Sequence, residues 1–180
     1  MAFSRSLTDT GISIVRYPKG AEAKYPESVK FEYSPSGLLK TAKIGSGKEQ
    51  FVIVTYSKVT EECIKAALSL SKEYPDRTFT VISLLQINPL PDDPVLYDAV
   101  CSADRLLFVE EHIRSGGIGE KLAASEKVHR TLPIHAIENT KIPCGDLDSI
   151  RKFTKMDAES ISSRMREEMK KAMKYRVLVD

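Results

Sequence analysis

The sequence predicts an α/β fold, a three-layer α/β/α domain built on a mixed, mostly parallel five-stranded sheet. From about residue 49 onward, short runs of β-branched and aromatic residues alternate with segments of helical periodicity. The runs are apolar throughout, which is typical of strands whose two faces are both covered by helices. At 180 residues, 42% of them hydrophobic, the chain has roughly the size of one globular domain with a little left over.

Composition excludes several classes of protein. The 27 Lys and Arg residues nearly balance the 25 Asp and Glu residues, for a net charge of +2, so we expect no nucleic-acid partner and no membrane-surface partner. No stretch approaches the ~20 consecutive apolar residues of a membrane span. Cys63, Cys101 and Cys144 are widely spaced and form no metal-binding pair, which predicts no metal site and a reducing, cytoplasmic location.

The first strand-and-helix unit begins at residue 51. Residues 51–56 are predicted to form a strand buried on both faces. Ser57 or Thr60 is expected to cap the helix that follows, because a hydroxyl can accept a hydrogen bond from the first free amides. Helical spacing predicts one buried stripe on this helix, formed by Val59, Cys63, Ala66, Ala67 and Leu70. The Tyr-Pro-Asp segment at residues 74–76 ends the helix, because proline cannot continue it.

The same unit repeats toward the C-terminus. Further strands are predicted over residues 79–85, 105–109 and 132–137, and helices over residues 93–103, 116–125 and 146–153. A longer helix follows Asp157, with Ile161, Met165, Met169 and Ala172 along one face. Strands separated by helices of this length indicate a parallel sheet with helices on both sides.

The segment ahead of residue 49 does not follow that unit. Residues 38–44 are expected to form a hairpin with residues 51–55, which would add one antiparallel strand. Residues 12–17 are predicted as a strand, whereas residues 21–36 are polar, contain two prolines and are predicted to be a linker. A strand ahead of a linker suggests that the chain begins inside a preceding domain.

Two glycine-containing turns are candidate anion sites. The segment at residues 45–49 lacks the Ser or Thr that a phosphate loop needs after its lysine, so a flexible turn is the better interpretation. Gly116, Gly117 and Gly119 follow a predicted strand and open a helix, where free amide N–H groups can bind an anion. The spacing is not that of a dinucleotide-binding turn, and Glu120 adds negative charge, so close helix packing or a subunit contact is favoured over a phosphate site.

Glu110, Glu111 and His112 lie at the carboxyl end of a predicted parallel strand, where open α/β sheets place their sites. Neighbours along a strand point to opposite faces, so these three side chains are not expected to act as one catalytic cluster. A structural or interface role is therefore favoured for Glu110 and His112. No Gly-x-Ser-x-Gly turn is present, and no residue is assigned as catalytic.

Basic residues outside this cluster suggest two further contacts. Arg16 follows a predicted strand, and a guanidinium binds phosphate bidentately, so a phosphate contact and a plain surface role are equally supported there. Residues 151–176 hold nine basic and four acidic side chains. A solvated helix face is favoured over an RNA or partner patch for that segment.

Several short segments, in their order and spacing, resemble a known family. They are residues 51–57, Ile87-Asn-Pro-Leu90, Phe108-Val-Glu-Glu-His112 and Gly116-Gly-Ile-Gly119. Together they resemble the C-terminal domain of transketolase-like thiamine diphosphate enzymes. Ile142-Pro-Cys-Gly145 and Asp157-Ala-Glu-Ser-Ile161 make the 1-deoxy-D-xylulose-5-phosphate synthases the most similar branch, over about residues 12–165.

The resemblance implies a domain division and a role for the whole enzyme. Residues 1–20 would be a remnant of the pyrimidine-binding domain, residues 21–36 the linker, and residues 37–180 the transketolase C-terminal-like domain. The full enzyme would be a transferase that condenses pyruvate with glyceraldehyde 3-phosphate in isoprenoid precursor synthesis. Thiamine diphosphate and Mg²⁺ would be held by the other domains, so this fragment alone is expected to bind no cofactor and to be inactive.

The same resemblance implies partners and one binding residue. The partners would be the remaining domains of the enzyme and a second copy in a homodimer. Arg16 matches the arginine of the family's Arg-Tyr-Pro segment, which contacts the substrate phosphate.

Departures from the family pattern leave other functions open. Leu85 and Pro91 stand where the family has Arg and Asp, and Ser57 replaces a usual Gly. One alternative is a free-standing regulatory or anion-binding module that uses the helix start at residues 116–119. Another is the C-terminal domain of a keto-acid dehydrogenase β subunit, against which the Arg-Tyr-Pro-Lys-Gly segment at residues 16–20 argues.

Overall fold

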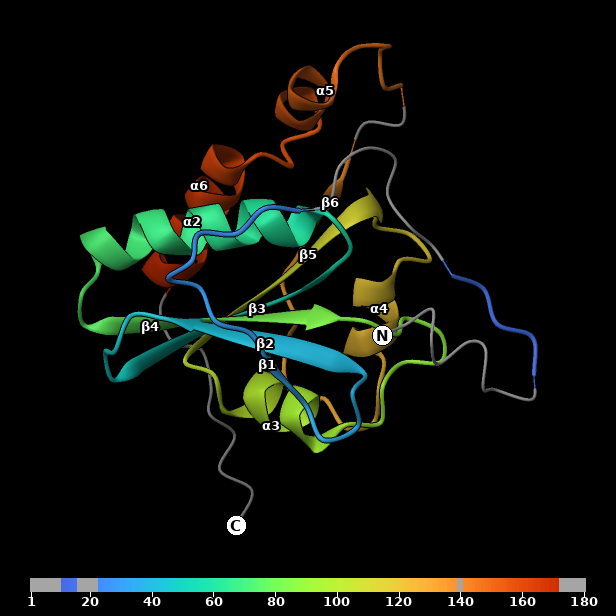
Figure 1. Cartoon of the computed structure of the whole chain (residues 1–180), viewed down its shortest axis with the longest axis horizontal. Coiled ribbons are helices and arrows are strands. Elements are labelled where there is room, and N and C mark those ends of the chain that lie inside the picture. The colour runs from blue at the N-terminus through green and yellow to red at the C-terminus, as the bar shows by residue number, and fades with distance from the viewer. Residues whose placement is uncertain (1–10, 16–22, 139–140, 172–180) are drawn as a thin grey trace.

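A computed structural model describes residues 11–15, 23–138 and 141–171 of the chain. Strands and helices alternate along these residues (Figure 1). The strands are β1 (Glu32–Tyr33), β2 (Leu39–Ile44), β3 (Glu49–Tyr56), β4 (Arg77–Leu84), β5 (Arg105–Ile113) and β6 (Ile134–Ile137). The helices are α2 (Val59–Glu73), α3 (Pro94–Ser102), α4 (Ile118–Ala123), α5 (Leu147–Phe153) and α6 (Ala158–Lys170).

The described strands form one mixed sheet in the order β1-β2-β4-β3-β5-β6. Strands β4, β3, β5 and β6 are parallel to one another, and β2 is antiparallel to β4. The predicted three-layer fold and its mostly parallel sheet are therefore confirmed. The predicted count of five strands is wrong, because the two-residue β1 also pairs with β2. So short a strand in a polar segment has no alternation that sequence patterning can detect.

The predicted hairpin between residues 38–44 and 51–55 does not form. β2 pairs with β4, from Leu39 opposite Leu84 to Ile44 opposite Phe79. Both edges of β3 are taken by its parallel partners β4 and β5. The turn between β2 and β3 therefore passes over the start of β4, where a Cβ on Gly47 would lie 1.9 Å from the backbone of Asp76. Close backbone approach, and not a phosphate, explains this glycine turn.

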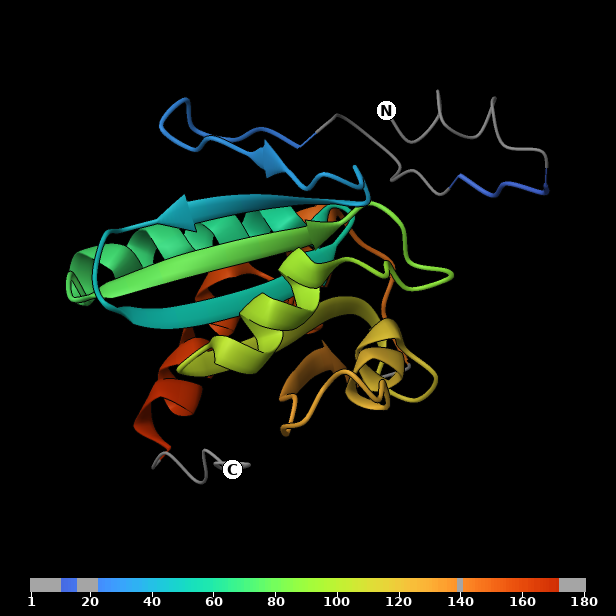
Figure 2. The same ribbon diagram turned by 90° about the horizontal axis from the view of Figure 1, so that it is seen from below.

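Helices cover both faces of the sheet (Figures 1 and 2). One buried cluster joins α2 and α6 to one face of the sheet and includes the whole predicted stripe of α2, from Val59 to Leu70. The second cluster joins α3 and α4 to the opposite face and includes Leu96, Val100 and Leu122. The hydrophobic effect thus acts on both sides of β3, β4 and β5, which accounts for their uninterrupted apolar runs.

Aspartate side chains, and not hydroxyls, cap the described helices α3, α5 and α6. Asp93, Asp146 and Asp157 each cap a helix by accepting hydrogen bonds from the first amides of α3, α5 and α6. The predicted cap of α2 is wrong: Lys58 stands at that position and makes no side-chain cap. The hydroxyl of Thr60 instead lies 3.0 Å from that of Ser83 on β4.

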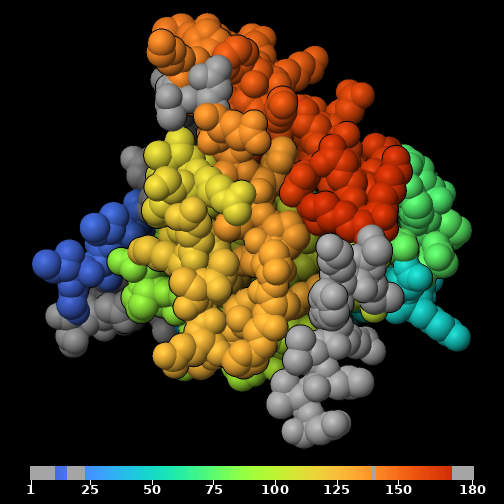
Figure 3. All heavy atoms as spheres, turned by 180° about the vertical axis from the view of Figure 1, so that it is seen from behind, coloured from blue at the N-terminus to red at the C-terminus, as the bar shows by residue number. Residues whose placement is uncertain are grey.

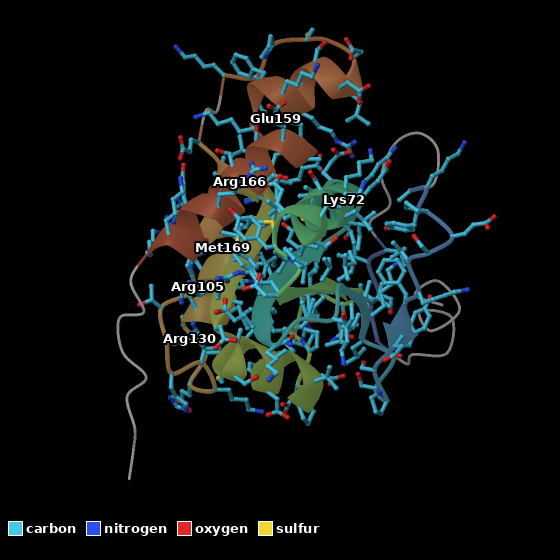
Figure 4. All side chains as sticks on the ribbon, turned by 90° about the vertical axis from the view of Figure 1, so that its left-hand side faces the viewer. Lys72, Arg105, Arg130, Glu159, Arg166 and Met169 are labelled. Atoms are coloured by element: carbon cyan, nitrogen blue, oxygen red, sulfur yellow. The ribbon has the colours of Figure 1, made fainter. Side chains whose placement is uncertain are left out.

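α6 lies against α2 and closes one side of the domain (Figure 4). Arg166 of α6 donates to both carboxylate oxygens of Glu73 on α2, at 3.1 and 2.6 Å. Met169, near the end of the predicted apolar face, packs against the same cluster. Ala172, which was expected to continue that face, lies outside the described residues.

The N-terminal segment differs from the prediction. Residues 12–15 form no strand, and Ile12 and Ile14 are 98% and 91% exposed. An isolated strand has no partner for its backbone hydrogen bonds, so apolar alternation alone does not order it. Residues 23–36, predicted as linker, contain β1 and pack Tyr25, Val29 and Phe31 against the core. The division into domains at residues 20 and 36 stays a prediction.

Candidate functional site

The carboxyl ends of β3 and β5 meet at the point where the sheet reverses its direction of winding. β3 leads through α2 to β4 on one side, whereas β5 leads through α4 to β6 on the other. Open α/β sheets bind ligands at such a point, because the two loops diverge there and leave a crevice. Tyr56 ends β3 and Glu110 lies in the last half of β5, so these two side chains define the candidate site.

Glu110 is fully buried at this position. Its Oε2 accepts a hydrogen bond from the amide of Ile118 at 2.9 Å and another from the Tyr56 hydroxyl at 3.4 Å. Burial raises the pKa of Glu110, and the nearby amides, His112 and Tyr56 only partly oppose that shift. Its Oε1 has no hydrogen-bond partner among the described residues.

Two glycines of the turn after β5 stand where neighbouring side chains leave no room for a Cβ. A Cβ on Gly117 would lie 2.4 and 2.7 Å from the two carboxylate oxygens of Glu110. A Cβ on Gly119 would lie 2.9 Å from the ring of Phe108. Gly116 has a φ of +71°, which side-chain-bearing residues rarely adopt. Glu110 therefore occupies the helix start where an external anion was considered, and the glycines serve close packing.

The other two residues of the Glu-Glu-His segment, Glu111 and His112, have partners other than Glu110. His112 is exposed, and its Nδ1 lies 2.7 Å from the carbonyl oxygen of Ile113. Glu111 lies on the α5 side, where its Oε1 is 3.9 Å from Nε of Arg151. The segment thus forms no single catalytic cluster. A subunit contact at His112 stays a prediction, and Arg16 lies outside the described residues.

A buried ion pair beside this site was missed by the sequence analysis. Glu62 of α2 and Arg151 of α5 are both buried and lie 2.9 Å apart, Oε1 to Nη1. Glu62 Oε2 also accepts a hydrogen bond from the amide of Ala158, the first residue of α6. Glu62 is spaced three residues from Val59 and four from Ala66, so helical periodicity already placed it on the buried stripe. A charged residue on that stripe was the available signal.

The donor atoms of the described residues do not fit a magnesium–diphosphate site. No group of three or more His, Cys, Asp or Glu side chains comes together there in a way that could hold a metal ion. The glycine-rich helix start at residues 116–119 faces Glu110, whose carboxylate already accepts a hydrogen bond from the Ile118 amide. Within the same part of the chain, no helix is both long and apolar enough to cross a membrane.

Comparison with protein families gives one match that covers most of the sheet. The family described as transketolase, C-terminal domain, matches residues 40–161. This range runs from β2 to the first turn of α6 and includes all buried members of the two core clusters except Leu39 and Met165.

Curated relatives are distant and longer than this chain. Transketolase-like protein 1 of Mus musculus is 29% identical over 119 residues, which are 66% of this chain and 19% of the relative. A putative transketolase C-terminal section of Methanocaldococcus jannaschii is 27% identical over 139 residues, 73% of this chain and 42% of the relative. A 1-deoxy-D-xylulose-5-phosphate synthase of Aliivibrio salmonicida is 30% identical over 113 residues, 61% of this chain and 17% of that enzyme. The chain thus spans less than half the length of each of these relatives.

Solved structures agree on the fold. A chain of a split-gene transketolase, solved as an inactive β4 tetramer, superposes with a TM-score of 0.59 at 17% identity and covers 83% of this chain and 46% of that one. At this identity the likeness concerns the arrangement of the strands and helices alone.

Proposed function

Because this chain belongs to the transketolase C-terminal domain family, we propose that it serves as the C-terminal section of a transketolase-type transferase. Its task would be to complete and stabilise an enzyme whose reacting groups lie in other domains. The family match over residues 40–161 is the observation that carries this proposal. The lengths of the relatives support it, since the matched region is only a part of each of them.

The exposed N-terminal segment supports the same function. Ile12 and Ile14 lie on either side of Ser13 and are almost fully exposed in this chain. Apolar side chains in such a pattern are typical of a strand that pairs elsewhere. In the proposed enzyme this segment joins the sheet of the pyrimidine-binding domain and ties that domain to the present one.

For the whole enzyme we propose the 1-deoxy-D-xylulose-5-phosphate synthase reaction, with pyruvate and glyceraldehyde 3-phosphate as substrates. The Ile-Pro-Cys-Gly segment at residues 142–145 and the Asp-Ala-Glu-Ser segment at residues 157–160 support this choice over transketolase itself. Thiamine diphosphate and Mg²⁺ would be bound by the other two domains, and Arg16 would contact the substrate phosphate. A homodimer is the proposed assembly.

Reconstitution tests this function. The purified chain is mixed with a separately expressed section that carries the diphosphate-binding and pyrimidine-binding domains of a 1-deoxy-D-xylulose-5-phosphate synthase. The section is cut just before the strand that residues 12–17 would supply. We expect neither part alone to be active and the mixture to form product from pyruvate and glyceraldehyde 3-phosphate. Ketol transfer from a ketose phosphate to an aldose phosphate is assayed in parallel.

The pattern of activity distinguishes the proposals. Ketol transfer without condensation of pyruvate would retain the transferase section but overturn the synthase assignment. Tight binding of thiamine diphosphate by the chain alone, measured by calorimetry, would overturn the proposal that the other domains hold the cofactor. Arg16→Ala should raise the KM for glyceraldehyde 3-phosphate far more than that for pyruvate, whereas Lys24→Ala should change neither.

A further inference from the structure

β6 is the last strand of the sheet and leaves one edge without a neighbouring strand among the described residues. Its inner edge pairs with β5, and the amide of Phe108 donates to the carbonyl oxygen of Pro133 at 2.8 Å. In the space-filling view, β6 comes to the surface between α4 and α6 (Figure 3). An open edge of this kind is a template on which another chain can pair.

The backbone of β6 presents regularly spaced hydrogen-bonding groups along this edge. In a strand, the N–H and C=O of one residue point to one side and those of the next residue to the other. Because the Pro133 carbonyl faces β5, the groups of Ile134 and Ala136 face away from it. No hydrogen bond from another described residue reaches these outward groups. An added strand would pair with both residues.

A groove follows the same edge. Its volume is about 1030 Å³, and all five consecutive residues from Ile134 to Glu138 line it. Side chains of consecutive strand residues alternate between faces, so a groove lined by all of them must run along the edge itself. The opposite wall is supplied by the end of α5, the loop after it, and α6. The groove is therefore long enough and correctly oriented for an extended segment.

The wall of the groove carries an excess of positive charge. Its basic residues are Arg114, Lys152, Lys155 and Arg164, and its acidic residues are Glu138 and Glu167. Arg164 already pairs with Glu167 at 3.0 Å and Glu168 at 2.6 Å. Lys152 and Lys155 form no ion pair with any other residue in the described ranges. The wall formed by the end of α5 and the loop after it therefore attracts negative charge.

We infer that this groove binds an extended acidic segment of a partner protein, which adds to the sheet as a strand beside β6. Backbone pairing with Ile134 and Ala136 supplies the affinity, and Lys152 and Lys155 select side chains of the right charge. Because side chains of the added strand alternate, those facing the end of α5 and the loop after it are acidic and those facing α4 are apolar. This inference does not depend on the proposed enzyme function, since a peptide can test it on the isolated chain.

The probe is a fluorescein-labelled peptide of about eight residues, the length of an ordinary strand, that alternates valine and glutamate. Binding to the full chain is followed by fluorescence anisotropy, and amide NMR shifts locate the site. We expect saturable binding with the largest shifts at Ile134 and Ala136, and weaker binding as the salt concentration rises. The same peptide with lysine in place of glutamate should bind at least about fivefold more weakly.

Two variants separate backbone pairing from charge. Ala136→Pro removes an outward N–H while leaving the ladder to β5 intact, because proline is tolerated where the N–H faces away from the sheet. It should abolish binding without lowering the thermal midpoint appreciably. The double variant Lys152→Glu/Lys155→Glu should weaken binding about fivefold or more. Lys72→Glu, in the last turn of α2 and outside the groove, is the matched control and should bind as the wild type does.

Four results would contradict the inference or a part of it. Unchanged binding by Ala136→Pro would overturn the strand addition. Equal binding of the glutamate and lysine peptides would overturn the charge selection. Competition by inorganic phosphate at about millimolar concentration, with no shift at the β6 amides, would show an anion site instead. Binding only after deletion of residues 172–180 would show that the groove serves the chain's own C-terminal segment, which would also overturn the inference.

Discussion

At the carboxyl edge of the sheet, the side chain of Glu110 restricts which residues can form the turn between β5 and α4. Gly117 has space for a hydrogen only, because the carboxylate of Glu110 lies against its Cα. The sequence favoured close helix packing or a subunit contact for the glycine and a structural or interface role for Glu110, and the close packing is confirmed. The burial of Glu110 could not be seen, since a glutamate at a strand end is normally exposed.

Gly117→Ala tests this packing. The added methyl group would lie within 2.7 Å of both carboxylate oxygens, so either Glu110 or α4 must move. We expect a loss of about 1–3 kcal/mol in the free energy of unfolding, as for other overpacked sites. Urea unfolding measures it. Gly145→Ala is the control, because its new Cβ would meet atoms no nearer than 3.8 Å; equal effects of the two variants would contradict this account.

Glu110 also predicts a dependence of stability on pH. Burial raises its pKa in the folded chain above the ordinary value of 4.5, so the folded state binds the proton more tightly than the unfolded state. The stability that this gives is fully present below the unfolded pKa and is lost as the pH rises through the folded pKa. The free energy of unfolding of the wild type, measured relative to Glu110→Gln in urea between about pH 4 and 7, should fall as the pH rises. A difference that stays flat or rises would refute the assignment.

Ser57 is a third residue whose backbone matters more than its side chain. Its φ of +60° is in the left-handed region, which glycine adopts readily and residues with a side chain rarely adopt. Ser57→Gly should stabilise the chain by about 0.5–1 kcal/mol, because the strain is relieved although the unfolded chain gains entropy. Thermal unfolding measures the gain. Ser69→Gly, at an exposed position inside α2, should instead destabilise.

At the scale of elements, the helices were predictable and the order of the strands was not. Aspartates at helix starts and prolines at helix ends are local signals, so α3, α5 and α6 begin at the residues expected from sequence. Partner choice is not local: residues 38–44 satisfy the pattern of a hairpin strand, yet β4 takes that place beside β2. The pattern of apolar residues predicts which side chains are buried, but it does not predict which strand pairs with each edge of a given strand.

The pair formed by Glu62 and Arg151 connects three helices at one point. Glu62→Gln would remove the nearer of the two carboxylates from the buried guanidinium of Arg151, leaving Glu111 at 3.9 Å, and would weaken the contact to the start of α6. We expect a loss of about 3 kcal/mol in the free energy of unfolding, as for other broken buried pairs. The double variant Glu62→Gln/Arg151→Met should recover most of it. If the single and double variants lose the same amount, the pair has no net coupling.

At the scale of the whole molecule, the two segments that precede β2 differ in how they contact the core. Residues 11–15 are exposed, whereas residues 23–36 are held by β1 and by contacts of Phe31 and Tyr25 with the core. The fold class and the layer arrangement followed from the apolar runs of the strands. The attachment of the segment at residues 23–36 did not follow, since its aromatic residues are scattered among polar ones.

Ile12→Ser/Ile14→Ser tests that boundary. In the isolated chain the double variant should leave the free energy of unfolding unchanged to within about 0.5 kcal/mol, because exposed positions contribute little. In the reconstituted enzyme of the proposed function, the same variant should weaken association of the two sections, as measured by calorimetry. Phe31→Ser is the contrasting variant and should destabilise the isolated chain itself. Destabilisation by the isoleucine variant alone would place residues 12–14 inside the domain.

The insertion of β4 between β2 and β3 has a consequence for synthesis on the ribosome. When residues 39–56 emerge, β2 can pair only with the two-residue β1, since the strand that will cover its other edge is still inside the exit tunnel or not yet translated. It must wait until α2 has been made and residues 77–84 have followed. Contacts between distant parts of a chain form slowly. We therefore expect nascent chains stalled before residue 77 to be protease-sensitive over β2, and those stalled well after residue 84 to be protected.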